Sequence, residues 1–157
     1  MESMKVSSTK KMIVEWKGNL RLEAKNEKGL TVQFDAPKEH GGEETALSPM
    51  ENVLASLASC SSFHVLTILK KKRMNVTGYF VEATAERRDE PPRIFTKIHL
   101  KYIVKGENIT PEAVESAIKL SEEKYCSVGG MLQKAVPITS SFEILKEARE
   151  PENLLRV

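Results

Sequence analysis

Apolar and polar positions alternate with a period of two in three short segments at the start of the chain. This alternation predicts β-strands near residues 12–16, 20–25 and 30–35. Glycine-containing turns separate the segments, and Pro37 ends the third one. We therefore expect an antiparallel meander of three strands with one face toward solvent.

The segment after the loop that follows Pro37 has the periodicity of an α-helix. Ser48-Pro49-Met50-Glu51 predicts a capping box with proline at the first helical position, and the helix should run to about Arg73. Apolar residues occupy most of its circumference, so the helix should be buried on nearly all sides. In a chain this short, either a surrounding sheet or a second subunit would have to cover it.

The second half of the chain contains two further strands, a second helix and a last strand. The strands are expected at residues 75–86, 94–104 and 138–145, and the helix at 110–126. One apolar stripe of this helix contains Val114, Ala117, Ile118 and Tyr125. Strands followed by a helix, twice over, predict the α+β class.

The 157 residues suit one domain, with a core at about 12–145 and peripheral ends at 1–10 and 147–157. The net charge of +2, from 24 basic and 22 acidic residues, gives no reason to expect a nucleic-acid partner. We expect no apolar run to approach the roughly 20 residues that span a bilayer, and the N-terminus lacks the apolar core of a signal peptide. A cytoplasmic protein without a membrane partner is expected.

The two cysteines, Cys60 and Cys126, are the candidates for chemistry. In a reducing compartment they are either buried thiols or a redox pair. His64 follows Cys60 by four residues, so the two side chains neighbour each other on a helix and either share a proton or simply pack in the core. Cys126 is either a structural cysteine at a helix end or a thiol activated by the start of another helical turn.

A metal site is not expected. His40, His64, His99 and the two cysteines supply ligand atoms, but none has the spacing of a known metal motif. No phosphate-binding loop, dinucleotide fingerprint or serine-nucleophile motif is present in the sequence.

The segments SPMENVLASLASC and EKYCSVGGML together resemble the OsmC/Ohr family of osmotically inducible protein C and organic hydroperoxide resistance proteins. The resemblance covers roughly residues 12–145. It rests on the loop APKEHGG, on the proline that opens the helix, on Cys60 eleven residues after that proline, and on Cys126 near the end of the second helix.

The resemblance implies an OsmC-like fold, in which antiparallel sheets wrap around two long helices of an intertwined homodimer with active sites at the subunit interface. It also implies a thiol peroxidase for organic hydroperoxides, and less well for hydrogen peroxide, that serves in oxidative stress defence. Cys60 would become a sulfenic acid, and Cys126 would condense with it to a disulfide. A dithiol would reduce the disulfide, and no cofactor or metal is needed.

Several positions depart from the family pattern and place the chain in a divergent OsmC-like branch. The family glutamate follows the helix-opening proline directly, whereas here Met50 takes that position and Glu51 comes next. On an ideal helix the nine residues to Cys60 correspond to about 900°, which puts Glu51 on the opposite side. The nearest match to the family arginine is Arg21. His64 is a further candidate to support the thiolate.

A second function stays open beside the peroxidase. An OsmC-like dimer that kept the fold and the cleft would bind a small apolar ligand with weak or no turnover. The cysteines would then keep their thiols in the presence of hydroperoxide.

Overall fold

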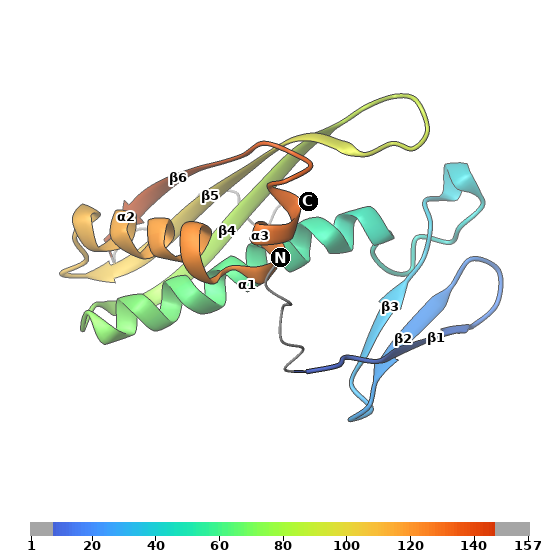
Figure 1. Ribbon diagram of the computed structural model, residues 1–157, viewed down its shortest axis with the longest axis horizontal. Helices are drawn as coiled ribbons and strands as arrows, with labels where there is room; N and C mark the ends of the chain where they lie inside the picture. The colour runs from blue at the N-terminus through green and yellow to red at the C-terminus, as the bar shows by residue number, and fades with distance from the viewer. Residues whose placement is uncertain (1–7, 147–157) are drawn as a thin grey trace, which may run out of the picture. The chain divides into compact units, whose positions relative to one another are not determined.

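A computed structural model describes residues 8–146 (Figure 1). Residues 1–7 and 147–157, which include most of the expected peripheral ends, lie outside the described residues. The chain forms two compact units, one ending at Asn52 and the other beginning at Val53. Each contains a three-stranded sheet, so the expected α+β class is confirmed.

The N-terminal unit contains strands β1 (Met12–Trp16), β2 (Leu22–Asn26) and β3 (Thr31–Phe34). They pair antiparallel in the order β1-β2-β3, which confirms the predicted meander. The expected burial of one face does not hold for β1, because all five of its residues are exposed. Within the N-terminal unit, the described residues leave the apolar side chains of β1 exposed.

Asp35 organises the loop that follows β3. Its buried carboxylate accepts hydrogen bonds from the backbone N–H groups of Ala36 at 2.7 Å, Glu43 at 3.3 Å and Thr45 at 3.0 Å, and from the Thr45 hydroxyl at 2.6 Å. The Thr45 bonds are the main reason that the pKa of Asp35 falls to about 2. The short 3₁₀-helix η1 (Lys38–His40) lies within this loop.

Helix α1 (Pro49–Lys71) is 23 residues long and begins at the predicted capping box. The backbone N–H of Ser48 donates to the Glu51 carboxylate at 2.8 Å, and the N–H of Glu51 donates to the Ser48 hydroxyl at 3.3 Å. The two bonds satisfy donors that the first helical turn leaves free.

The C-terminal unit contains β4 (Asn75–Arg87), β5 (Phe95–Glu107) and β6 (Ile138–Leu145) in the order β4-β5-β6. Strands β4 and β5 are antiparallel, but β6 runs parallel to β5, which corrects the expectation of purely antiparallel sheets. The physical reason is the connection: the chain between β5 and β6 is long enough to return to the starting end of the sheet.

The second helix is shorter than expected. It consists of α2 (Pro111–Leu120), a π-helical turn η2 (Ser121–Tyr125) and, after Cys126, the short helix α3 (Ser127–Leu132). A π turn inserts an extra residue into the helical period. Tyr125 therefore does not continue the buried stripe of α2, and its side chain is 44% exposed.

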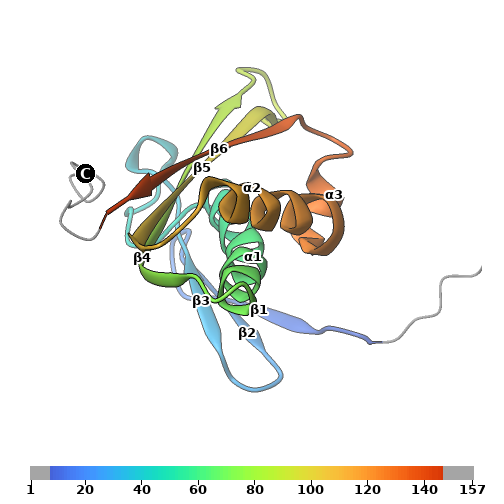
Figure 2. The ribbon, with the colours of Figure 1, turned by 90° about the vertical axis from the view of Figure 1, so that its left-hand side faces the viewer.

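Helices α1 and α2 lie on the same face of the C-terminal sheet (Figures 1 and 2). The buried positions of α1 recur every four residues, and those of β5 every second residue. They are Leu57, Ser61, Val65 and Leu69 on α1, and Ile98, Leu100, Tyr102 and Val104 on β5. This core fixes the side of α1 that bears the polar and thiol groups described below.

The remaining circumference of α1 is less covered than predicted, because Phe63 is 71% and Leu66 is 37% exposed. Among the described residues, α1 is also the one helix long and apolar enough to cross a membrane, with a mean hydropathy of 1.5 and 28% of that stretch buried. The expectation that no segment approaches this length is therefore wrong. A core helix passes the same test, and one face of α1 packs on the sheet as a core helix does.

Candidate functional site

Cys60 lies on α1 beside the core of the C-terminal unit. Its side chain is half-buried and packs against the buried cluster. The next residue, Ser61, is fully buried, so this stretch of the helix faces the strands and the π turn rather than solvent.

Cys126 lies where the π turn ends and α3 begins. Its backbone N–H donates to the Ser121 carbonyl at 2.7 Å, which closes the π turn. Its sulfur accepts a hydrogen bond from the backbone N–H of Gly129 at 3.3 Å, and its side chain caps α3. The thiol is buried, with 5% of the residue exposed.

The structure brings the two thiols together although they are 66 positions apart in the sequence. Burial raises the pKa of Cys126 to about 11; the Gly129 N–H opposes this shift, while a hydrogen bond with Cys60 adds to it. Cys126 thus keeps its proton at neutral pH, close to the Cys60 thiol. The arrangement suits Cys60 as the attacking sulfur and Cys126 as the thiol that reacts second.

A small cavity of about 70 Å³ lies beside Cys126. Its lining combines apolar residues with the polar side chains of Ser61, Glu122 and Gln133. This volume exceeds the roughly 30 Å³ that one water molecule occupies in the liquid. A small polar group therefore fits next to the second thiol.

A chain of buried hydroxyl groups leads to the same cavity. The Ser61 and Tyr102 hydroxyls are 2.5 Å apart, and the Ser121 hydroxyl is 3.1 Å from that of Ser61. Either hydroxyl can donate in the Ser61–Tyr102 bond, and the Ser121 hydroxyl also donates to the Ser61 carbonyl at 3.0 Å. The Tyr102 hydroxyl donates to a Glu122 carboxylate oxygen at 3.4 Å, so the chain of hydroxyls ends at Glu122.

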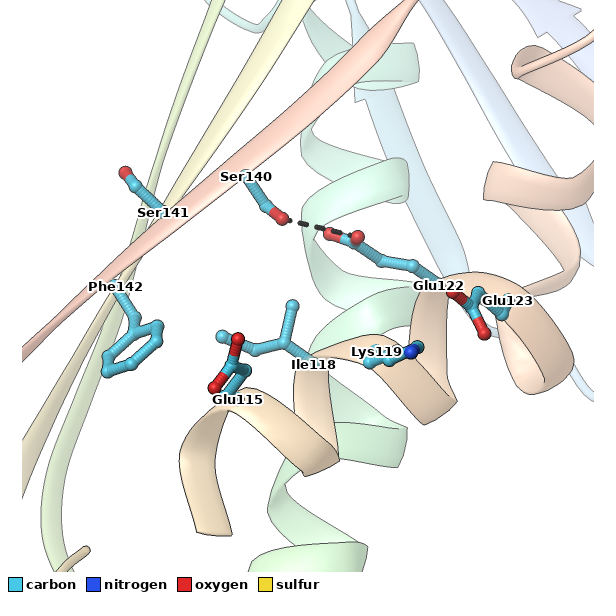
Figure 3. A pocket seen from close by; sticks show the side chains of 8 residues that line it. All are labelled: Glu115, Ile118, Lys119, Glu122, Glu123, Ser140, Ser141 and Phe142. Carbon is cyan, nitrogen blue, oxygen red and sulfur yellow. Dashed lines mark hydrogen bonds between the residues drawn. The ribbon is translucent and has the colours of Figure 1, made fainter. Parts of the chain in front are cut away.

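Glu122 comes from the π turn and lies between the cavity and a larger groove. Its second carboxylate oxygen accepts a hydrogen bond from the Ser140 hydroxyl of β6 at 3.2 Å (Figure 3). The groove, of about 430 Å³, lies between α2 and β6 and is also lined by Glu122. Burial is the main cause that raises the pKa of the carboxyl, and the hydrogen bonds from Ser140 and Tyr102 oppose it.

His64 follows Cys60 by four residues on α1, and its ring contacts Tyr125. The two rings stack, with centroids 5.6 Å apart and planes at 25°. Between these described residues, His64 and Cys60, no hydrogen bond is present. Support of the thiolate by His64 stays a prediction.

Arg21 and Glu51 belong to the N-terminal unit. Glu51 is held by the capping box at Ser48. The Arg21 guanidinium pairs with Glu43 at 3.1 Å and donates to the Lys17 carbonyl at 3.3 Å. Arg21 thus pairs with a carboxylate of the loop within the N-terminal unit. A role of Arg21 or Glu51 at the thiols stays a prediction.

Sequence reasoning missed Glu122 and its hydroxyl partners. Glu122 and Glu123 read as two polar residues on the outside of a continuous helix, because nothing in the residue types marks the π turn. Tyr102 is buried among the apolar side chains of β5, and a buried tyrosine does need a partner for its hydroxyl. Within residues 8–146, no group of three His, Cys, Asp or Glu side chains has the geometry of a metal site.

Known proteins resemble this chain in sequence. A family model for OsmC-like proteins matches residues 41–141. Protein YhfA of Escherichia coli (strain K12) is 42% identical over 132 residues, which cover 84% of this chain and 96% of YhfA.

Solved structures share the fold. A hypothetical protein from Aquifex aeolicus VF5 has a TM-score of 0.78 at 34% identity, covering 89% of this chain and 98% of that one. An organic hydroperoxide resistance protein OsmC from Legionella pneumophila has a TM-score of 0.67, covering 88% of this chain and 99% of that one. At 16% identity the second similarity shows the fold alone.

Proposed function

Because the chain belongs to the OsmC-like protein family, we propose that it is a thiol-dependent peroxidase that reduces organic hydroperoxides and, less well, hydrogen peroxide. The observation that carries the proposal is the proximity of the two thiols, which come from α1 and from the start of α3 and meet at the same core cluster. Some family structures belong to organic hydroperoxide resistance proteins, which supports this chemistry for the fold. A role in oxidative stress defence follows from the substrate.

The reaction has three steps. The Cys60 thiolate attacks the distal oxygen of the hydroperoxide, and the O–O bond breaks. Cys60 becomes a sulfenic acid, and the alkoxide takes up the proton that the thiol lost and leaves as an alcohol. The Cys126 sulfur then attacks the Cys60 sulfenic acid, so that a disulfide forms and water leaves. A dithiol reductant finally exchanges with the disulfide and restores both thiols, which suits a reducing compartment such as the cytoplasm.

The proximity of the sulfurs favours the second step. A sulfenic acid on Cys60 forms next to the thiol that removes it, so the condensation needs no diffusion and little rearrangement. Burial of Cys126 also keeps it from competing with Cys60 for the hydroperoxide, because a protonated thiol is a poor nucleophile.

We also propose a homodimer with the sites at the subunit interface. The apolar residues exposed on α1 and β1 support it, since a monomer rarely leaves so many large apolar side chains in water. They are Phe63 and Leu66 on α1, and Met12, Ile13, Val14 and Trp16 on β1.

Reaction with hydroperoxide tests the proposal. The reduced protein is mixed with cumene hydroperoxide, and the free thiols are counted over time. Wild type should lose both thiols rapidly, Cys60→Ser should lose none, and Cys126→Ser should stop at an oxidised Cys60. Steady reduction of hydroperoxide with dithiothreitol should disappear in Cys60→Ser.

Thiols that stay free at a large excess of hydroperoxide would contradict the peroxidase. That outcome would favour the alternative of an OsmC-like dimer that binds a small apolar ligand. Oxidation of Cys60→Ser at the wild-type rate would contradict the assignment of Cys60.

A further inference from the structure

The reaction of Cys126 requires the loss of a proton. With a pKa of about 11, only about one molecule in ten thousand has the Cys126 thiolate at pH 7. General bases typically accelerate such proton-limited steps by about 10²–10⁴-fold. A base near Cys126 would therefore offset the penalty that burial imposes on this thiol.

Glu122 has the position of such a base. It lines the same cavity as Cys126, and that cavity has room for one water molecule to bridge the carboxylate and the thiol. The Tyr102 and Ser140 hydroxyls each donate to one carboxylate oxygen, which fixes the carboxylate between β5 and β6. Glu122 also lines the groove between α2 and β6 (Figure 3), which offers a route for proton exchange with solvent.

We propose that Glu122 is the proton shuttle for the attack of Cys126 on an oxidised or otherwise modified Cys60. The carboxylate takes the Cys126 proton across the cavity. The Cys126 thiolate attacks the Cys60 sulfur, the S–S bond forms and the S–O bond of the sulfenic acid breaks. Glu122 returns its proton to the leaving hydroxide, so one water is released and the carboxylate is regenerated. For the attack on a sulfenic acid, this inference rests on the proposed peroxidase function.

Other titratable groups near Glu122 are less suited. Glu123 is exposed in the same π turn, and His64 stacks on Tyr125. His99 of β5 is engaged by the Thr139 and Ser141 hydroxyls at 2.7 and 2.8 Å. The titratable groups that face Glu122 from the surrounding elements are Glu115 and Lys119 of α2, Glu123 of the π turn, His99 and Tyr102 of β5, and Cys126.

The test uses 5,5′-dithiobis(2-nitrobenzoic acid) in place of hydroperoxide, so that it does not depend on peroxidase activity. The reagent modifies Cys60 and releases one thionitrobenzoate; attack of Cys126 on this mixed disulfide then releases a second. The rate of the second release reports the reactivity of Cys126. Cys126→Ser defines the first release alone.

Glu122→Gln is the key variant, because its amide oxygen can accept one of the two hydroxyl hydrogen bonds and its NH₂ can donate to the other hydroxyl, but it does not accept a proton. At pH 7 the second release should slow by about 10²-fold or more, with the first release unchanged. In wild type the rate of the second release should level off above the pKa of Glu122. In the variant it should rise about tenfold per pH unit toward the pKa of Cys126. Glu123→Gln is the matched control and should behave as wild type.

A second release that is equally fast in Glu122→Gln, or that shows the wild-type pH profile, would overturn the inference. Equal slowing in Glu123→Gln would also overturn it. If hydroperoxide leaves the wild-type thiols free while Glu122→Gln slows the second release, the peroxidase proposal fails and the proton-shuttle role stands.

Discussion

The contact between the two thiols depends on a residue without a side chain, Gly129. A Cβ atom at this position would lie 3.2 Å from the Cys126 sulfur and 3.6 Å from Leu57. The same residue donates its N–H to the sulfur at 3.3 Å. Gly130, one position later, has no atom within 4 Å of its would-be Cβ.

Gly129→Ala should therefore displace the Cys126 sulfur, whereas Gly130→Ala should not. Relative to Gly130→Ala, we expect Gly129→Ala to lose about 1–3 kcal/mol of unfolding free energy through overpacking. Disulfide formation with Cys60 should also slow. Gly130→Ala itself should be neutral or slightly stabilising, since alanine favours a helix by about 0.5–1 kcal/mol. Denaturant unfolding gives the unfolding free energy of both variants, and thiol kinetics give their rates of disulfide formation. Equal free energies and equal rates in the two variants would contradict the role of Gly129.

At the residue scale, the sequence could indicate the two cysteines but not the groups around them. Resemblance to the OsmC/Ohr family singled out Cys60 and Cys126. The spacing of Cys60 from the helix-opening proline, and the position of Cys126 at a helix end, can both be read from the sequence. Glu122 was not visible, since its significance depends on hydroxyls from β5 and β6 that are 18–20 residues away. Glu51 was expected to complete a capping box, and the hydrogen bonds to Ser48 confirm this structural role.

Among the elements, the loop between β3 and α1 depends on one ionised carboxylate. Asp35 binds three backbone N–H groups and the Thr45 hydroxyl. Since its folded pKa of about 2 lies below the ordinary 3.8, the ionised form stabilises the loop. That contribution is fully present above the ordinary pKa and is lost as the pH falls toward the folded value.

Amide hydrogen exchange at Ala36, Glu43 and Thr45 checks this prediction. In wild type, protection of these amides should hold above about pH 4 and fall between that pH and about 2. In Asp35→Asn, protection should already be low at pH 7 and should change little across the acid range. Unchanged protection in Asp35→Asn at pH 7 would contradict the role of the carboxylate.

The regular elements were predictable because their signals are periodic and local. Alternation of apolar residues located β1, β2 and β3, a single apolar face located β5, and the capping box located the start of α1. The π turn was not predictable, since an inserted residue leaves no mark in the residue types of Ser121–Tyr125. The parallel pairing of β6 was also missed, because strand direction depends on where the preceding helices return the chain.

For the whole molecule, the open question is what covers the exposed apolar side chains of α1 and β1. A two-fold symmetric dimer would repeat each contact. Burial of Phe63, now 71% exposed, would contribute about 1.5–3 kcal/mol per subunit. The apolar circumference of α1 predicted from the sequence is consistent with such cover.

Light scattering at micromolar concentration should give about twice the mass of a single 17.6 kDa chain. Phe63→Glu should shift the protein toward monomer, because two charges would enter the interface. Ile94→Glu, at an apolar residue that is 47% exposed in the β4–β5 turn, is the control and should stay dimeric. A wild-type mass near that of one chain would contradict the dimer.

The central claim is that Cys60 and Cys126 form one redox pair. The most direct measurement is peptide mapping by mass spectrometry, without reduction, after treatment with one equivalent of cumene hydroperoxide. The account predicts an intramolecular disulfide that joins the peptide of Cys60 to that of Cys126 and disappears with dithiothreitol. Two peptides that retain free thiols, or cysteines linked only to other molecules, would contradict it.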